Sequence, residues 1–110
     1  MEIERIKEEI AERLLRLEKP FKVILFGSHA SGSPSSESDI DLLVVLNKDK
    51  APKDFQERSE NYLKISRVLR DIERKIPLDI IVYTKPEFER FLQIGSLFSK
   101  TIMQEGKEIL

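Results

Sequence analysis

The sequence lacks cysteine and long apolar runs, and each absence excludes a class of protein. Without cysteine the chain has no disulfides and no thiolate metal sites, which is typical of a cytosolic protein. No apolar run reaches the length of a transmembrane helix, and the N-terminus lacks the pattern of a secretory signal. We therefore expect a cytoplasmic protein that does not bind a membrane.

The sequence also has almost no net charge. Its formal net charge is −1 at pH 7, although 35% of its residues are charged. Proteins that bind long nucleic acids usually carry a basic excess, because phosphate contacts supply much of the affinity. We therefore expect no extended nucleic acid partner, whereas a ligand the size of a nucleotide is compatible with this charge. The length of 110 residues predicts a single domain over residues 1–110.

Hydrophobic periodicity predicts alternating helices and strands. The expected helices are 2–18, 54–75, 86–93 and 97–104, and the expected strands are 21–26, 39–46, 78–83 and 107–110. The helix after Thr84 is predicted from the capping box Thr84-Lys-Pro-Glu87. In the longest helix, an apolar stripe predicts core residues, namely Phe55, Tyr62, Ile65, Leu69, Ile72 and Ile76. The predicted fold class is α/β (α+β), with a small mixed, mostly antiparallel sheet flanked by helices.

The loop between the first two strands consists of small and polar residues over positions 27–38. Its composition alone is that of a linker, but a loop of this length within a compact domain is more often functional. Gly27 permits close approach of the backbone to a ligand. The Ser28 hydroxyl and the N–H groups that follow it suit a triphosphate, particularly if a short helix begins there. The alternative is that Gly27-Ser28 forms an ordinary turn.

Three aspartates interrupt apolar strands. Asp39 and Asp41 are two residues apart, so both side chains point to the same face of the second strand. Asp79 lies between Leu78 and Ile80 of the third strand. If these strands are neighbours, the three carboxylates converge, and such a group is suited to two divalent metal ions at a phosphoryl-transfer site. The alternatives are a solvated strand start for the first two acids and an edge position facing water for Asp79.

The order of these motifs resembles the polymerase-beta-like nucleotidyltransferase superfamily. The resemblance is carried by Gly27-Ser28, by Gly32 and by the run Ser38-Asp-Ile-Asp-Leu-Leu-Val44, with Asp79 on a later strand. The short length is similar to that of the minimal nucleotidyltransferases, which are often antitoxin partners of HEPN-domain toxins.

The resemblance implies a function and the residues that perform it. It implies that Gly27 and Ser28 hold the triphosphate of ATP, and that Asp39, Asp41 and Asp79 bind two Mg²⁺ ions, with Mn²⁺ as a possible substitute. It also implies transfer of AMP to a hydroxyl, namely a tyrosine hydroxyl of a HEPN partner, within a hetero-oligomer.

The loop departs from the family pattern at two positions. Many members read Gly-Ser-Arg-Ala-Arg-Gly, whereas this chain has His29 and Ser31 in place of the two arginines. Because arginine forks are strong phosphate ligands, a first alternative is a catalytically weak antitoxin that neutralises its partner by binding. A second alternative is a small-molecule transferase of the aminoglycoside type.

The C-terminal segment is the candidate docking surface for a partner. It contains more apolar residues than two short helices need for packing, namely Phe88, Phe91, Leu92, Leu97, Phe98, Ile102 and Met103. Exposed apolar patches mark interaction sites. The alternative is that these residues complete the core.

Overall fold

The computed structural model describes residues 3–31 and 39–110, together with all their side chains except those of Ser28 and Ser31. The elements are α1 (Ile3–Leu17), β1 (Lys22–Phe26), α2 (Ser28–Ser31), β2 (Ile40–Val45), α3 (Phe55–Val68), α4 (Arg70–Glu73), β3 (Leu78–Tyr83), α5 (Lys85–Ile94), α6 (Leu97–Glu105) and β4 (Lys107–Glu108). None of the described helices is long and apolar enough to span a membrane.

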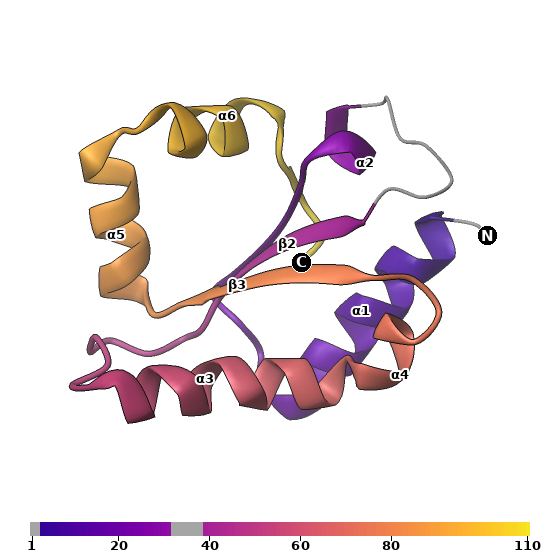
Figure 1. Ribbon diagram of the computed structural model, residues 1–110, viewed down its shortest axis with the longest axis horizontal. Coiled ribbons are helices and arrows are strands. Elements are labelled where there is room, and N and C mark those ends of the chain that lie inside the picture. The colour runs from indigo at the N-terminus through magenta and orange to yellow at the C-terminus, as the bar shows by residue number, and fades with distance from the viewer. Residues whose placement is uncertain (1–2, 32–38) are drawn as a thin grey trace.

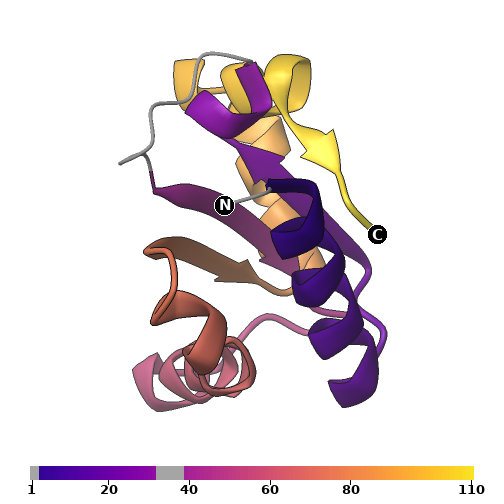
Figure 2. The same ribbon diagram turned by 90° about the vertical axis from the view of Figure 1, so that its right-hand side faces the viewer.

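The four strands form one mixed sheet in the order β3-β2-β1-β4. β1 is antiparallel to both β2 and β4, whereas β2 and β3 are parallel. Figure 2 shows β3 at one side of the sheet and β4 at the other. This architecture confirms the predicted fold class, a small and mostly antiparallel mixed sheet flanked by helices.

Helices cover both faces of the sheet. α1, α3 and α4 pack on one face and α5 and α6 on the other (Figure 1). We call these the α1/α3 face and the α5/α6 face. Each face has its own hydrophobic cluster, because alternate residues of a strand point to opposite sides. In β2, for example, Leu42 and Val44 belong to the α1/α3 cluster and Leu43 and Val45 to the α5/α6 cluster.

The helix predicted over residues 54–75 is divided into α3 and α4. The break lies at Leu69, whose φ and ψ are −100° and 6°. Leu69 is fully buried, so its place in the apolar stripe gave no sign of a break. The stripe itself is only partly core. Ile65 and Ile72 are buried, whereas Phe55 is 81% exposed and Tyr62 is 41% exposed.

The apolar residues of the C-terminal helices divide in the same way. Phe88 and Ile102 are buried, and Phe98 packs edge to face against Phe26 with ring centroids 5.7 Å apart. By contrast, Leu97 is 82% exposed and Met103 is 45% exposed. The capping box at Thr84 is present, since the Glu87 carboxylate accepts a 2.9 Å hydrogen bond from the Thr84 N–H.

An ion pair joins α1 to α4 and predicts how stability depends on pH. The Asp71 carboxylate accepts two hydrogen bonds from Arg13, one of them 2.6 Å long, and this guanidinium lowers the pKa of Asp71 from 3.8 to about 2. Because the pKa is lower in the folded state, the pair stabilises the fold above about pH 4, and this contribution disappears as the pH falls towards about 2. Asp71→Asn is therefore expected to lower Tm at pH 5 but not at pH 2, as measured by circular dichroism.

The matched control is Glu12→Gln, which removes the partner of Arg16 within α1. An exposed pair between neighbouring turns of one helix contributes little, so this variant should have nearly the same Tm as wild type at both pH values. An Asp71→Asn variant that is equally destabilised at pH 5 and pH 2 would contradict the assignment to the ion pair.

Candidate active site

The predicted acids lie at one end of the sheet because of how three strands pair. Asp41 of β2 is opposite Asp79 of the parallel strand β3 and opposite Phe26 of the antiparallel strand β1. The C-terminal end of β1 and the N-terminal ends of β2 and β3 therefore meet, at the right of Figure 1. Asp39 directly precedes β2. Strand alternation puts all three aspartates on the α5/α6 face.

The carboxylates differ in burial, and Asp41 is the perturbed one. Asp41 is half-buried, whereas Asp39 and Asp79 are exposed. Burial raises the pKa of Asp41, and the nearby charges of Asp79 and Asp39 raise it further, while His29 acts in the opposite direction. Like charges held together in this way are a common feature of functional sites.

Gly27 lies directly against the Asp41 side chain. It follows β1 with a φ of +77°, a backbone conformation that favours glycine. A Cβ added at this position would lie only 2.0 Å from Oδ2 of Asp41 and 3.0 Å from its Cγ. The absence of a side chain therefore lets the Asp41 carboxylate lie against the backbone at the end of β1. This contact connects the Gly-Ser motif to the aspartate pair.

A short helix begins directly after Gly27, as the triphosphate interpretation of the loop favoured. In α2, the Ala30 N–H donates a 3.1 Å hydrogen bond to the Gly27 carbonyl, and the Ala30 side chain is buried in the α1/α3 cluster. Ser28 is the first residue of this helix. Its hydroxyl, the Ser31 side chain and the motif positions Gly32 and Ser38 lie outside the part of the chain that is described.

His29 is the residue near the acids that sequence reasoning missed. A single histidine in a polar loop is usually solvated. The structure instead places it half-buried on α2, close enough for its charge to lower the pKa of Asp41. The sequence contained one indication of this proximity, namely that His29 is only two residues from Gly27. A residue so near the end of β1 lies close to the groups that Gly27 contacts.

The donor set at this end of the sheet suits a divalent cation. Asp39, Asp41 and Asp79 offer carboxylate oxygens, which Mg²⁺ and Mn²⁺ prefer. A bound cation would remove the repulsion that raises the pKa of Asp41. Within residues 3–31 and 39–110, however, no three acidic or histidine side chains are grouped closely enough to hold a metal ion. The assignment of these three ligands therefore remains a prediction.

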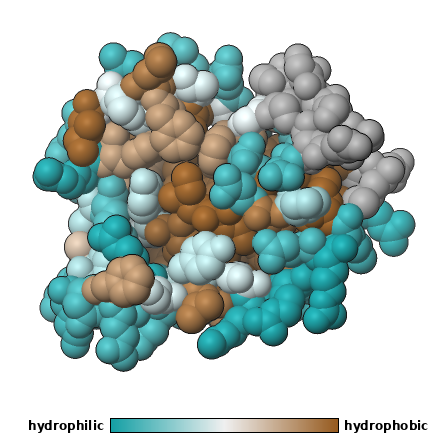
Figure 3. Space-filling view, viewed as in Figure 1, coloured by the Kyte–Doolittle hydropathy of each residue, from teal (hydrophilic) through white to brown (hydrophobic). Residues whose placement is uncertain are grey.

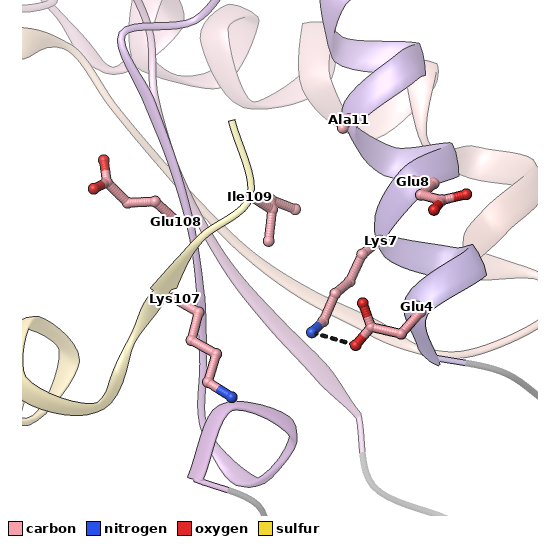
Figure 4. Close-up of a pocket in the computed structure, with 7 residues that line it drawn as sticks. All are labelled: Glu4, Lys7, Glu8, Ala11, Lys107, Glu108 and Ile109. Carbon is pink, nitrogen blue, oxygen red and sulfur yellow. Dashed lines mark hydrogen bonds and ion pairs between the residues drawn. The ribbon is translucent and has the colours of Figure 1, made fainter.

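A groove lies between α1 and β4, on the α1/α3 side of the sheet. Figure 4 shows Glu4 and Lys7 of α1 facing Lys107 of β4 across a groove of about 330 Å³. The charged groups here are largely paired. Lys7 lies 3.0 Å from Glu4, and Glu108 lies 2.7 Å from Lys22. None of the predicted site residues lines this groove.

Comparison with protein families gives one match, to the family described as the nucleotidyltransferase domain, over residues 4–109. No curated protein matches the sequence significantly. The fold is similar to that of a candidate nucleotidyltransferase from Sulfolobus solfataricus. The two are 29% identical, with a TM-score of 0.55 over 78% of this chain and 70% of the other.

Two further similar structures are toxin–antitoxin proteins. One was crystallised with AMP-PNP. It is 20% identical, with a TM-score of 0.56 over 94% of this chain and 72% of the other. The other is a mutant of MntA-HpeT that carries two aspartate-to-glutamate substitutions. It is 18% identical, with a TM-score of 0.55 over 94% of this chain and 72% of the other. At these identities the likeness shows a common fold.

Proposed function

Because this chain belongs to the nucleotidyltransferase-domain family, we propose that it transfers AMP from ATP to a hydroxyl of a toxin partner, as the antitoxin of the pair. The observation that carries the proposal is the end of the sheet where Asp41 lies beside Asp79 and against Gly27. Family membership gives the reaction class, and this juxtaposition supports the proposal that these residues perform it.

The donor and the partner are inferred from the structural relatives and from the motif resemblance. A toxin–antitoxin relative was crystallised with AMP-PNP, an analogue of ATP, which favours ATP as the donor. A second relative is also a toxin–antitoxin, which favours a toxin as the acceptor. The mutant relative was altered at two aspartates spaced as Asp39 and Asp41 are here. The resemblance to minimal nucleotidyltransferases suggests that the acceptor is a tyrosine of a HEPN-domain protein.

In the proposed mechanism, Asp39, Asp41 and Asp79 would hold Mg²⁺, and the ion when bound would neutralise phosphate charge. Gly27 lets the backbone approach the triphosphate, and the Ser28 hydroxyl donates a hydrogen bond to it. The acceptor hydroxyl gives its proton to Asp79. Its oxygen then forms a bond to the α-phosphorus while the bond to pyrophosphate breaks. The protein's contribution is positioning and charge compensation.

A second candidate function is neutralisation of the toxin by binding alone. His29 and Ser31 stand where many family members have arginines, so this chain has fewer cations in the loop that would face the triphosphate. Weak triphosphate affinity would leave a stable complex with little or no transfer. The two candidates share the partner and differ in the chemistry.

Transfer is tested with ATP labelled at the α-phosphate, Mg²⁺ and the product of the neighbouring gene. We expect label on a tyrosine of that product, located by mass spectrometry, and no label when Mg²⁺ is removed by a chelator. A complex that forms without labelling at any Mg²⁺ concentration would favour the second candidate. If neither a complex nor labelling is observed, both candidates fail for that partner.

A further inference from the structure

We propose that the outer edge of β3 binds an extended segment of the acceptor protein as an added strand, with the acceptor hydroxyl beside Asp79. The inference rests on the proposed function for the nature of the acceptor. The structural basis of the inference is independent of that function. It consists of the edge strand β3 and the two hollows on either side of it.

β3 has an open edge. It is the last strand of the sheet, and no described strand pairs with its outer side. The carbonyls of Pro77 and Tyr83 accept hydrogen bonds from the β2 side, from Ile40 at 3.0 Å and from Leu46 at 2.8 Å. Because backbone groups alternate along a strand, the N–H and C=O groups that point outward belong to the residues between, namely Leu78, Ile80 and Val82.

This edge has little of the usual protection against strand pairing. Natural edge strands are commonly blunted by proline, lysine or a bulge. β3 has the sequence Leu-Asp-Ile-Ile-Val-Tyr, in which Asp79 is the one charged residue. Figure 3 looks onto this edge and shows hydrophobic side chains between α6 above and α3 below, with α5 at the left. An open and apolar strand of this kind is suited to β-augmentation.

A hollow flanks the edge on each face of the sheet. On the α1/α3 face, a hollow of about 450 Å³ is lined by side chains of α3 and by Val82. On the α5/α6 face, a hollow of about 300 Å³ is lined by side chains of α5 and by Tyr83. Side chains of an added strand point alternately to the two faces. Successive residues of the segment would therefore enter the two hollows in turn.

The lining of the hollows indicates the chemistry of the segment. Phe55, 81% exposed, and Tyr62, 41% exposed, line the α3 hollow, so an apolar side chain fits there. Phe91 and Ile94 line the α5 hollow together with Arg90. Within residues 3–31 and 39–110, no ion pair joins Arg90 to a carboxylate, so an acidic residue of the segment would pair with it. The segment is therefore expected to be apolar with an acidic residue at the Tyr83 end.

One ion pair separates the two hollows. Arg58 of α3 lines both of them, and its guanidinium lies 3.3 Å from the Glu87 carboxylate of α5. The Arg58 side chain is 61% exposed, whereas the Glu87 side chain is only 13% exposed. The Arg58 guanidinium therefore remains accessible to the carboxylate of an incoming segment while it pairs with Glu87.

The strand connects the hollows to the proposed catalytic end. Asp79 precedes Val82 by three residues, a distance of about 10 Å along a strand. A residue of the added strand directly beside Asp79 would have its side chain on the same face as the Asp79 carboxylate. A tyrosine, serine or threonine at that position of the added strand would therefore place its hydroxyl beside the aspartates. This residue would be three positions away from the apolar side chain in the α3 hollow.

The test uses amide hydrogen exchange with a synthetic peptide. The peptide has alternating valine and threonine, a tyrosine near one end and a glutamate at the other, and the control peptide has proline at its two central positions. At millimolar concentration the first peptide is expected to slow exchange at the Ile80 and Val82 amides by about tenfold or more. No slowing, or equal slowing by the proline peptide, would overturn the proposal. If exchange at these amides slows with increasing protein concentration in the absence of peptide, the edge instead binds a second copy of this chain.

Two matched variants separate the edge from the rest of the surface. Phe55→Ala is expected to weaken binding of the first peptide by about five- to tenfold. Leu15→Ala is the control, because Leu15 is an exposed apolar residue of α1, 48% exposed, but it lines neither hollow. Its effect should be below about twofold. Equal effects of the two variants would refute docking in the α3 hollow.

The inference and the proposed function can fail separately. Hydrogen exchange is measured without nucleotide and therefore does not depend on transfer. If the peptide protects the amides of Ile80 and Val82 but is not labelled when ATP and Mg²⁺ are added, the edge remains a binding site and the proposed AMP transfer to hydroxyls is refuted. Conversely, equal labelling of both peptides, unaffected by Phe55→Ala, would support transfer and eliminate the edge as the docking surface.

Discussion

Replacing Asp39 and Asp41 with asparagine is expected to abolish nucleotide transfer and to raise the Tm of the metal-free protein. Both changes keep the side-chain shape and remove charge. Transfer should fall by about a thousandfold or more, because asparagine cannot supply the charge that a metal and a triphosphate require.

The gain in stability follows from the sign of the pKa shift. The pKa of Asp41 is raised in the folded state by burial and by Asp79 and Asp39. A carboxyl group with a raised pKa destabilises the fold once it ionises. Removing these charges therefore stabilises the protein at neutral pH and has less effect at acidic pH, where the carboxyls are protonated. Calorimetry at both pH values, without and with Mg²⁺, measures this directly.

The control for this experiment is Asp49→Asn. Asp49 follows β2 on an exposed segment, where it lies 3.4 Å from Lys85, and it is remote in register from the catalytic end. This variant should transfer AMP at the wild-type rate and show no gain in Tm. A double variant that retains wild-type transfer would refute the assignment of the two acids. A fall in its Tm would refute the like-charge argument.

Gly27→Ala is expected to reduce transfer by about a hundredfold while leaving the protein folded. The new methyl group would lie 2.0 Å from Oδ2 of Asp41, so the carboxylate must move. Displacement of a catalytic group by about 1 Å costs on the order of a hundredfold in rate. The positive φ of +77° adds backbone strain of about 1–2 kcal/mol.

Gly95→Ala is the matched control, because it separates strain from displacement. Gly95 also has a positive φ, +61°, but an added Cβ would meet its neighbours at 3.8 Å or more. It should lower stability by about 1–2 kcal/mol and leave transfer unchanged. Denaturant titration gives the stabilities, and the labelled-ATP assay gives the rates. If Gly27→Ala lost no more activity than Gly95→Ala, the contact with Asp41 would have no catalytic meaning.

Much of the fold could be predicted from local sequence signals. The strand at residues 78–83 was predicted with its observed bounds, because Pro77 and the capping box at Thr84 frame an apolar run that only Asp79 interrupts. Where the prediction differed, the deciding interactions were not local. Phe55 and Tyr62 continue the apolar rhythm of α3, but they line an open hollow beside the edge strand β3 and remain exposed.

Sequence order predicts which residues form the candidate site, but not how they are arranged. The sequence order singled out Gly27, Asp39, Asp41 and Asp79, and three strand ends bring these positions to one end of the sheet. The contact between Gly27 and Asp41 depends on the pairing of β1 with β2. The register of Asp41 opposite Asp79 depends on a crossover through α3 and α4. Neither pairing can be read from periodicity, and the proximity of His29 to Asp41 follows from the same pairings.

The parallel pairing of β2 with β3 determines which changes in chain length the site can tolerate. The connection between the two strands runs through residues 46–77, so an insertion at its exposed turn would alter the route and leave both strands in place. A single residue inserted within β3 ahead of Asp79 would instead slip the register and turn that carboxylate to the opposite face. Homologues should therefore vary freely in the length of the crossover. The number of residues between the start of β3 and its aspartate should be constant among them.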